Sequence, residues 1–446
     1  MDKANGMERS APEDVPGSLS LAGAVSLGTG VMIGAGIFAL TGQTADLTGD
    51  LFPLAFIVAA IVVGFSAHSY VKLSDAYPSS GGIAMFLREM YGPGTATGVF
   101  ALFMYASMVI SESLVARTFG SYVLRVIPLQ PATFWVPALG VALLAVAFIV
   151  NVAGNRVIQA TEGTMAAIKI LGLAIFAVAG LWFANLTKFT SGSAPPPDSP
   201  IGFLAAVAIA ILAYKGFTTI ANSGGEIVDP HRNTGRAIII SIGVCTLIYL
   251  AIAATVAGNL SLDEIIAAQD SSLAEAARPA FGAAGVWFTV AIAVVATASG
   301  VMASVFAASR MLAMLTTMKE VPKLHIGLPG TTRTHTIVYT VALAMVLTAL
   351  FDLRQIAALG AIYYLIMDVA IHYGTLRHLR DRVPVRRWVL VTAMSLDVLV
   401  LSAFLRVKAS TDAVGIAAAG AGIVIIIVGE RLFMHSHTRP DGTMDM

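Results

Sequence analysis

The chain has 446 residues, of which 57% are hydrophobic and 12% are charged. Soluble domains carry about 25% charged residues, so this composition excludes a soluble globular protein as the main body of the chain. The net charge of +1 gives no basis for a nucleic-acid partner, and the single Cys245 excludes an intrachain disulfide framework.

Apolar runs recur almost to the C-terminus, and a bilayer core needs about 20 such residues per helix. We therefore predict an all-α, multi-pass protein of the cell membrane, with a polar tail at 1–19, a membrane domain at 20–432 and a second tail at 433–446. Twelve transmembrane helices are expected, near residues 20–44, 51–73, 96–125, 133–153, 158–184, 201–227, 237–258, 283–315, 335–351, 353–376, 388–407 and 411–432.

The loops between these helices indicate how the chain is oriented. Of the 27 Lys and Arg residues, 17 fall on the side of the two tails and 6 on the opposite side. Positive residues mark cytosolic loops, so both termini are predicted to be cytosolic. Two outer loops are expected, at 185–200 and 259–281. The second contains Ser261 and Glu264 at the spacing of a capping box, which predicts a short surface helix.

Glycine interrupts two of the predicted helices. The first contains Gly34-Ala35-Gly36, and the sixth contains Ala213-Tyr214-Lys215-Gly216-Phe217. Unwound backbone survives in a bilayer only where it lines a cavity, so we predict discontinuous helices 1 and 6 with a substrate between them. Free N–H groups of helix 1 would suit a carboxylate, and free carbonyls of helix 6 would suit an ammonium group. The alternative is that the glycines only permit close helix packing.

Several motifs, in chain order, resemble one transporter family. Gly34-Ala35-Gly36-Ile37-Phe38 resembles the helix 1 motif of the amino acid–polyamine–organocation (APC) superfamily, amino acid permease type. The helix 6 segment and the following residues 225–233 resemble that family's helix 6 and its cytosolic exit. Residues 78–93 resemble its first cytosolic loop, and residues 308–314 its helix 8 end.

The resemblance implies a fold and a mode of action. Its fold is a five-plus-five inverted repeat, here with repeat 1 at about 20–184, repeat 2 at about 201–376, and helices 11–12 at about 388–432 outside the repeat. Its mode of action is alternating access with a small-molecule substrate and no cofactor or bound metal. The substrate-binding residues expected on this basis and from the interruptions are Ile33, Gly34, Ala35, Gly36, Glu112, Leu212, Ala213, Tyr214, Lys215, Gly216 and Phe217.

Ionisable side chains inside a membrane span are costly and are functional candidates by default. Lys169 matches a lysine that some proton-coupled relatives place where sodium-coupled ones bind sodium, so Lys169 and Glu112 are the candidate proton-coupling residues. Each of the two also has a structural interpretation. Lys169 could be a permanently charged lysine that is hydrogen-bonded to carbonyls of helix 1, and Glu112 could be a hydrogen-bonded structural acid. Glu112 and Lys215 have similar predicted depth, and we expect them to form an ion pair that a substrate or a proton breaks.

Two positions depart from the family pattern. Leu212 stands where many relatives have an aromatic gate, and Thr218 stands where some have an acid. Lys215 favours an acidic substrate, or a carboxylate without an amine, over an ordinary neutral amino acid.

The predicted function is a secondary active transporter for an amino acid or a close relative, with the proton as coupling ion and lipid as its surroundings. A same-fold transporter of a polyamine, organic anion or inorganic ion, an exchanger, and a channel or receptor are the alternatives. No motif of a membrane enzyme is present, so the chain is not expected to be an enzyme.

Overall fold

The computed structural model describes residues 17, 19–79, 81–153, 155–184, 200–322 and 332–437. Most of both predicted tails and nearly all of the predicted outer loop at 185–200 lie outside these residues. Apart from an isolated bridge between Leu19 and Ile227, the described residues form helices and the loops that join them.

The long helices are α1 (Leu21–Thr48), α2 (Phe52–Ala76), α4 (Thr95–Val126), α5 (Ala132–Ala153), α6 (Asn155–Phe183), α7 (Pro200–Tyr214), α9 (Pro230–Asn259), α11 (Ser272–Thr317), α12 (Thr332–Leu350), α13 (Leu353–Gly374), α14 (Arg387–Thr411) and α15 (Ala413–His437). The short α-helices are α3 (Gly82–Tyr91), α8 (Thr218–Asn222) and α10 (Leu262–Ala268). The 3₁₀ turns are η1 (Gly49–Leu51), η3 (Lys215–Phe217), η4 (Gly224–Glu226) and η5 (Gln269–Ser271), and a π turn, η6, covers Thr375–Leu379.

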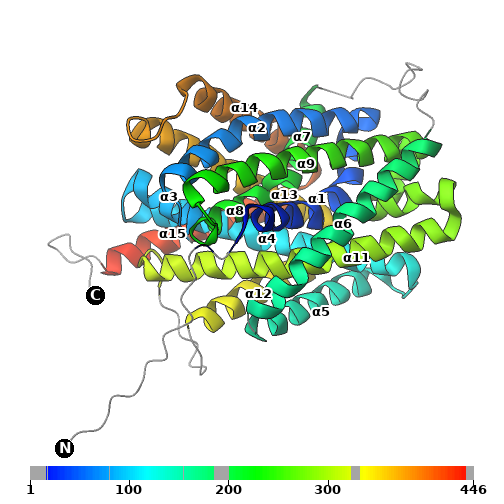
Figure 1. Cartoon of the computed structure of the whole chain (residues 1–446), viewed down its shortest axis with the longest axis horizontal. Helices are drawn as coiled ribbons and strands as arrows, with labels where there is room; N and C mark the ends of the chain where they lie inside the picture. The colour runs from blue at the N-terminus through cyan, green and yellow to red at the C-terminus, as the bar shows by residue number, and fades with distance from the viewer. Residues whose placement is uncertain are drawn as a thin grey trace, which may run out of the picture.

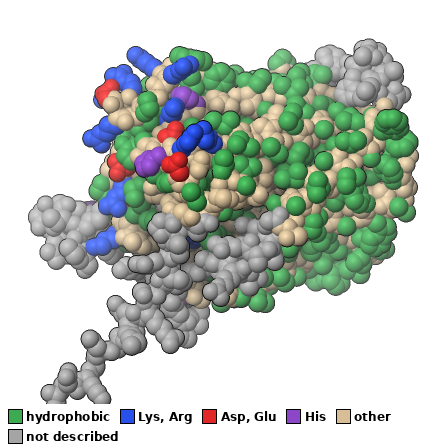
Figure 2. Space-filling view, viewed as in Figure 1, with side chains coloured by type: hydrophobic (Ala, Val, Ile, Leu, Met, Phe, Trp, Pro, Cys, Tyr) green, Lys and Arg blue, Asp and Glu red, His purple; other side chains and the backbone are tan. Residues whose placement is uncertain are grey.

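The helices have the length and surface of membrane spans. Within the described residues ten segments are long and apolar enough to cross a membrane, and two of these, Leu21–Ala76 and Leu262–Thr317, contain 56 residues each. Large apolar side chains face outward, such as Leu171 on α6 at 62% exposed and Leu247 on α9 at 72%. Hydrophobic side chains cover much of the visible flank, while Lys and Arg gather at one end (Figure 2). The chain is a multi-pass membrane protein.

Local sequence signals explain several helix boundaries. The capping box predicted at Ser261 and Glu264 is confirmed, and it begins α10 in the predicted loop at 259–281. A second capping box, Asp352 with Gln355, begins α13 directly after α12. In α11 the backbone turns at Gly282 (φ 57°, ψ −143°), so the spanning part starts after it, close to the predicted residue 283.

Helix α1 runs through the interior of the bundle, in contact with α7, α9 and α11 (Figure 1). The predicted break in this helix is wrong, because α1 is continuous α-helix from Leu21 to Thr48. Its glycines provide close contact instead. A Cβ added at Gly34 would lie 3.1 Å from Gly300 Cα of α11, and one at Gly36 would lie 2.8 Å from Ala213 Cα of α7. For helix 1 the alternative interpretation therefore applies, in which the glycines only permit close helix packing. The backbone N–H groups near Gly34 and Gly36 are used in hydrogen bonds within α1.

Candidate functional site

The predicted interruption of helix 6 is confirmed. Helix α7 ends at Tyr214, the 3₁₀ turn η3 covers Lys215–Phe217, and α8 continues from Thr218. The turn lies directly against α1, since a Cβ added at Gly216 would lie 2.6 Å from Met32 N. The carbonyl of Lys215 accepts a hydrogen bond from Thr218 Oγ1 at 2.9 Å. The backbone N–H of Thr218 also donates to the carbonyls of Lys215 and Gly216, so two carbonyls of the turn already accept hydrogen bonds.

A tyrosine from α9 joins the two helices at this level. The hydroxyl of Tyr249 lies 2.6 Å from Met32 O of α1 and 3.2 Å from Ala213 O of α7. A phenol has one proton, so the two carbonyls share a single donor. The backbone carbonyls predicted to receive an ammonium group are thus partly occupied by protein donors in this conformation.

Lys215 lies in the interruption itself, and Glu112 is a buried acid on the neighbouring helix α4. The ammonium of Lys215 donates to Ser107 O at 2.5 Å and to Ser107 Oγ at 2.8 Å, both on α4. Glu112 is fully buried on the same helix, and its Oε1 accepts from Ser304 Oγ of α11 at 3.2 Å. Its Oε2 has no hydrogen-bond partner among the described residues.

The expected direct ion pair between Glu112 and Lys215 is not formed. Ser107 and Glu112 are five residues apart on α4, which separates them by about 7.5 Å along the helix. Lys215 reaches the nearer of these two positions and binds Ser107 there. The two charges still interact electrostatically, so α4 presents a bound ammonium and an acid with a free oxygen to the same part of the interior.

Lys169 lies on α6 and contacts the other side of α1. Its ammonium donates to Gly30 O at 3.0 Å and to Ser299 Oγ of α11 at 2.7 Å, and the side chain is 2% exposed. A fixed structural lysine, the alternative to a proton-coupling role, is expected to make this contact with a carbonyl of helix 1. The ammonium of Lys169 links α6, on which it lies, to α1 and α11.

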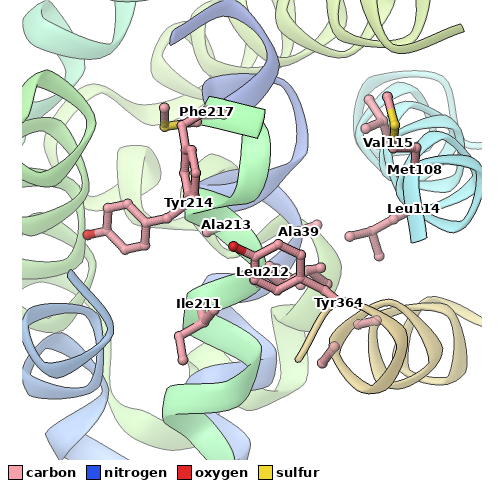
Figure 3. Packing of buried hydrophobic residues seen from close by; sticks show 14 of the residues in the cluster. Ala39, Met108, Leu114, Val115, Ile211, Leu212, Ala213, Tyr214, Phe217 and Tyr364 are labelled. Atoms are coloured by element: carbon pink, nitrogen blue, oxygen red, sulfur yellow. The ribbon is translucent and has the colours of Figure 1, made fainter. Parts of the chain in front are cut away.

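The remaining predicted residues form the wall of the site. Figure 3 shows Leu212, Ala213, Tyr214 and Phe217 around the turn, with Tyr364 of α13 nearby. Leu212 packs against Gly360 of α13, where an added Cβ would be 3.2 Å from its Cδ2. The ring of Tyr214 lies 5.0 Å from that of Tyr249. Ile33 is buried, and the side chain of Ala35 is outside the described set. Because these side chains are buried, the site is closed to solvent in this conformation.

Contacts at both ends of α1 hold this closed arrangement. At its start, Leu19 pairs with the backbone of Glu226 and Val228, and the Glu226 carboxylate forms an ion pair with Arg310 of α11. At its other end, a Cβ added at Gly42 would lie 2.3 Å from Gln269 O of η5. Movement of α1 relative to α11 therefore requires these contacts to break.

Comparison with known proteins identifies the family. The profile described as amino acid permease matches residues 19–429. This chain belongs to the amino acid permease family. It is a transporter of the APC type and not an enzyme, as the ordered motifs of its sequence predict.

Relatives of this permease include proteins from bacteria, archaea and animals. It is 32% identical over 372 residues to the inner membrane transport protein YbaT of Escherichia coli, covering 83% of this chain and 85% of the relative. It is 30% identical to the uncharacterized protein MJ0609 of Methanocaldococcus jannaschii, over 74% and 76% of the two chains. It is 28% identical to the mouse large neutral amino acids transporter small subunit 2, over 58% and 50%.

Two buried acids outside the predicted site, Asp368 and Asp397, share His372 as a partner. His372 Nε2 lies 3.7 Å from Asp368 Oδ2 on α13 and 3.3 Å from Asp397 Oδ2 on α14. Asp368 also accepts from Ser66 and Tyr70 of α2, each at 2.6 Å. The i, i+4 spacing of Asp368 and His372 was the available signal.

These imidazole and carboxylate groups are of the kind that metal ions accept, and their ligand atoms lie within 4.8 Å of one another. Their hydrogen bonds and ion pairs join α2, α13 and α14 in the bundle interior.

Proposed function

We propose that this permease is a secondary active transporter that moves an amino acid or a closely related molecule by alternating access. The observation that carries the proposal is the 3₁₀ interruption of helix 6, with a buried ammonium at Lys215 and a buried carboxylate at Glu112 that has one free oxygen. A buried charge is costly unless a ligand or a partner offsets it. A zwitterion offers one charge of each sign.

The proposed recognition assigns one role to each charged group. The substrate carboxylate replaces Ser107 as the partner of Lys215, and the substrate ammonium binds the free oxygen of Glu112. Leu212, Tyr214 and Phe217 border the substrate side chain, and Gly36 and Gly216 let the backbones of α1 and η3 approach it. This assignment replaces carboxylate binding by helix 1, since α1 has no free N–H groups at mid-helix.

Proton coupling is proposed to involve Lys169 and Glu112. Lys169 binds a carbonyl of α1 and a hydroxyl of α11, so loss of its charge weakens the link between those helices. Protonation of Glu112 removes the charge that holds a substrate ammonium. Both events therefore couple a proton to the movement of a helix or to the release of a ligand.

The proposed topology has twelve crossings and both termini in the cytosol. The segment Leu21–Ala76 supplies two crossings through α1 and α2, and the shorter apolar helix Thr334–Leu350 supplies one. The inverted repeats remain those proposed at about 20–184 and 201–376, with α14 and α15 outside them. The tails at 1–19 and 433–446 flank the domain.

Uptake by the purified permease in proteoliposomes tests the proposal. A panel of radiolabelled neutral, acidic and basic amino acids, polyamines and organic acids is offered under an inward proton gradient. Saturable accumulation of an amino acid that disappears with the gradient supports the proposal, and accumulation of an organic acid without an amine contradicts the role of Glu112.

Two charge-removing variants and one matched control complete the experiment. Lys215→Met and Glu112→Gln are each expected to raise the KM for the accumulated amino acid at least tenfold. Glu430→Gln removes another buried acid, on α15, away from the interruption, and should leave KM unchanged. Normal uptake by both Lys215→Met and Glu112→Gln would remove these residues from substrate binding.

A further inference from the structure

A groove of about 760 Å³ lies between α2 and the start of α14, apart from the interruption in helix 6. Basic side chains line one part of it, namely His68 and Lys72 of α2 and Arg386 just before α14. Among the described residues no acid lines the groove, and neither Lys72 nor Arg386 forms an ion pair. Asp75, one turn from Lys72 on α2, interacts with it electrostatically. His68 Nε2 accepts from Arg386 N at 3.4 Å, which holds the basic ends of the two helices together.

The other part of the groove is apolar and faces the lipid. Ile61 is 53% exposed, and a Cβ added at Gly64 would meet no atom within 4 Å. Trp388 is 59% exposed and contacts Phe65 edge to face, with ring centroids 6.1 Å apart. Tryptophan is typical of the membrane–water boundary. The groove therefore crosses from hydrocarbon depth to the charged end of the molecule seen in Figure 2.

We propose that this groove binds an anionic phospholipid. Its phosphate lies between Lys72 and Arg386, and one acyl chain passes over Gly64 beside Ile61 and Phe65. Two cations that form no ion pair with a described residue, above an apolar channel, complement a lipid that carries a net negative charge and a hydrocarbon tail. A zwitterionic lipid has its own cation beside the phosphate and gains less from the same residues.

Charge removal tests the headgroup contact. The purified full-length permease in detergent is titrated with phosphatidylglycerol or phosphatidylcholine, and bound lipid is counted by native mass spectrometry. Each Lys or Arg near a lipid surface contributes about fivefold to anionic lipid binding. We therefore expect the double variant Lys72→Gln/Arg386→Gln to bind phosphatidylglycerol about 30-fold more weakly. The control Arg232→Gln/Arg236→Gln removes the same charge from exposed positions on α9 and should retain the preference.

A second variant tests the acyl channel without changing any charge. Gly64→Leu places a side chain in the open part of the groove, where its Cβ meets no protein atom within 4 Å and the side chain displaces an acyl chain. It is expected to weaken phosphatidylglycerol binding without lowering the unfolding temperature in lipid-free detergent. Equal binding by wild type, Lys72→Gln/Arg386→Gln and Gly64→Leu would overturn the proposal. Inorganic phosphate that displaces phosphatidylglycerol at equal concentration would also overturn it, because it would show a site for the phosphate group alone.

Discussion

A single methyl group added at Gly36 tests the close contact between α1 and α7. In Gly36→Ala the new Cβ would lie 2.7 Å from Ala213 Cβ, 2.8 Å from Ala213 Cα and 2.8 Å from the hydroxyl of Tyr249. Two of these three atoms belong to Ala213, whose helix cannot yield by a side-chain rotation. The two helices must therefore separate, and the hydroxyl of Tyr249 must move away from Met32 O.

The cost of the substitution has two parts. Overpacking of a close-packed interior costs about 1–3 kcal/mol, and weakening a hydrogen bond to a buried carbonyl costs about 0.5–1.5 kcal/mol. These effects sum to about 1.5–4.5 kcal/mol. Alanine is favoured over glycine in a helix interior by about 1 kcal/mol, so we expect Gly36→Ala to lower the free energy of unfolding by about 0.5–3.5 kcal/mol.

Reversible unfolding in mixed micelles, followed by tryptophan fluorescence, measures this free energy. The matched control is Gly243→Ala on α9, where an added Cβ meets no atom within 4 Å. In a helix interior alanine is favoured over glycine by about 1 kcal/mol, so the control should not destabilise the protein. If Gly36→Ala is as stable as Gly243→Ala, α1 and α7 are not in the contact described, and the steric argument for a continuous α1 fails.

Three further substitutions test other contacts. Tyr249→Phe removes the hydroxyl that donates to the carbonyls of Met32 and Ala213 and should cost about 0.5–1.5 kcal/mol of unfolding free energy in the same assay. Arg310→Gln breaks the largely buried ion pair with Glu226 and should cost about 1–3 kcal/mol, with a lower uptake rate. Burial raises the pKa of Glu320, which lies after α11 and accepts from Gly94 N. The contribution of Glu320 to the free energy of unfolding is therefore largest below the pKa of Glu320 in the unfolded chain, and it is lost as the pH rises through the pKa in the folded protein. Glu320→Gln should flatten this decline in stability. A series of unfolding curves at different pH values would show the difference.

Each of these has a control of the same chemistry at an exposed position. Tyr373→Phe, Arg377→Gln and Glu89→Gln change side chains on α13, η6 and α3 that face outward. A loss of stability in a control equal to that in its partner would assign the effect to the residue type and not to the contact. A Glu320→Gln protein with the wild-type pH profile would refute the titration argument.

The helices and their approximate limits could be predicted because apolar length and capping residues are local properties. The capping box at Ser261 and the interruption at Lys215–Phe217 both follow from short stretches of sequence. The interruption of helix 1 was predicted on the same basis and is wrong. Glycine permits either unwinding or close approach, and the choice depends on Gly300 and Ala213, which are far away in the sequence.

The charged residues show the same limit. The depth of Glu112 and Lys215 in the bundle could be predicted, and both are buried. Their partners could not, because Ser107 and Ser304 are ordinary residues that become partners only through helix packing. Likewise, the partner of Asp397 lies on a neighbouring helix, 25 residues earlier in the chain.

The pairing of Leu19 with the strand-like residues around Ile227 has a practical consequence. Leu19 N donates to Glu226 O, and Leu19 O accepts from Val228 N, both at 2.9 Å. These bonds attach the N-terminal end of α1 to Glu226 and Val228. The carboxylate of Glu226 forms the ion pair with Arg310 of α11. An N-terminal truncation should therefore stop before Leu19. A fusion partner attached directly at Leu19 would strain these hydrogen bonds, and with them the contact between α1 and α11.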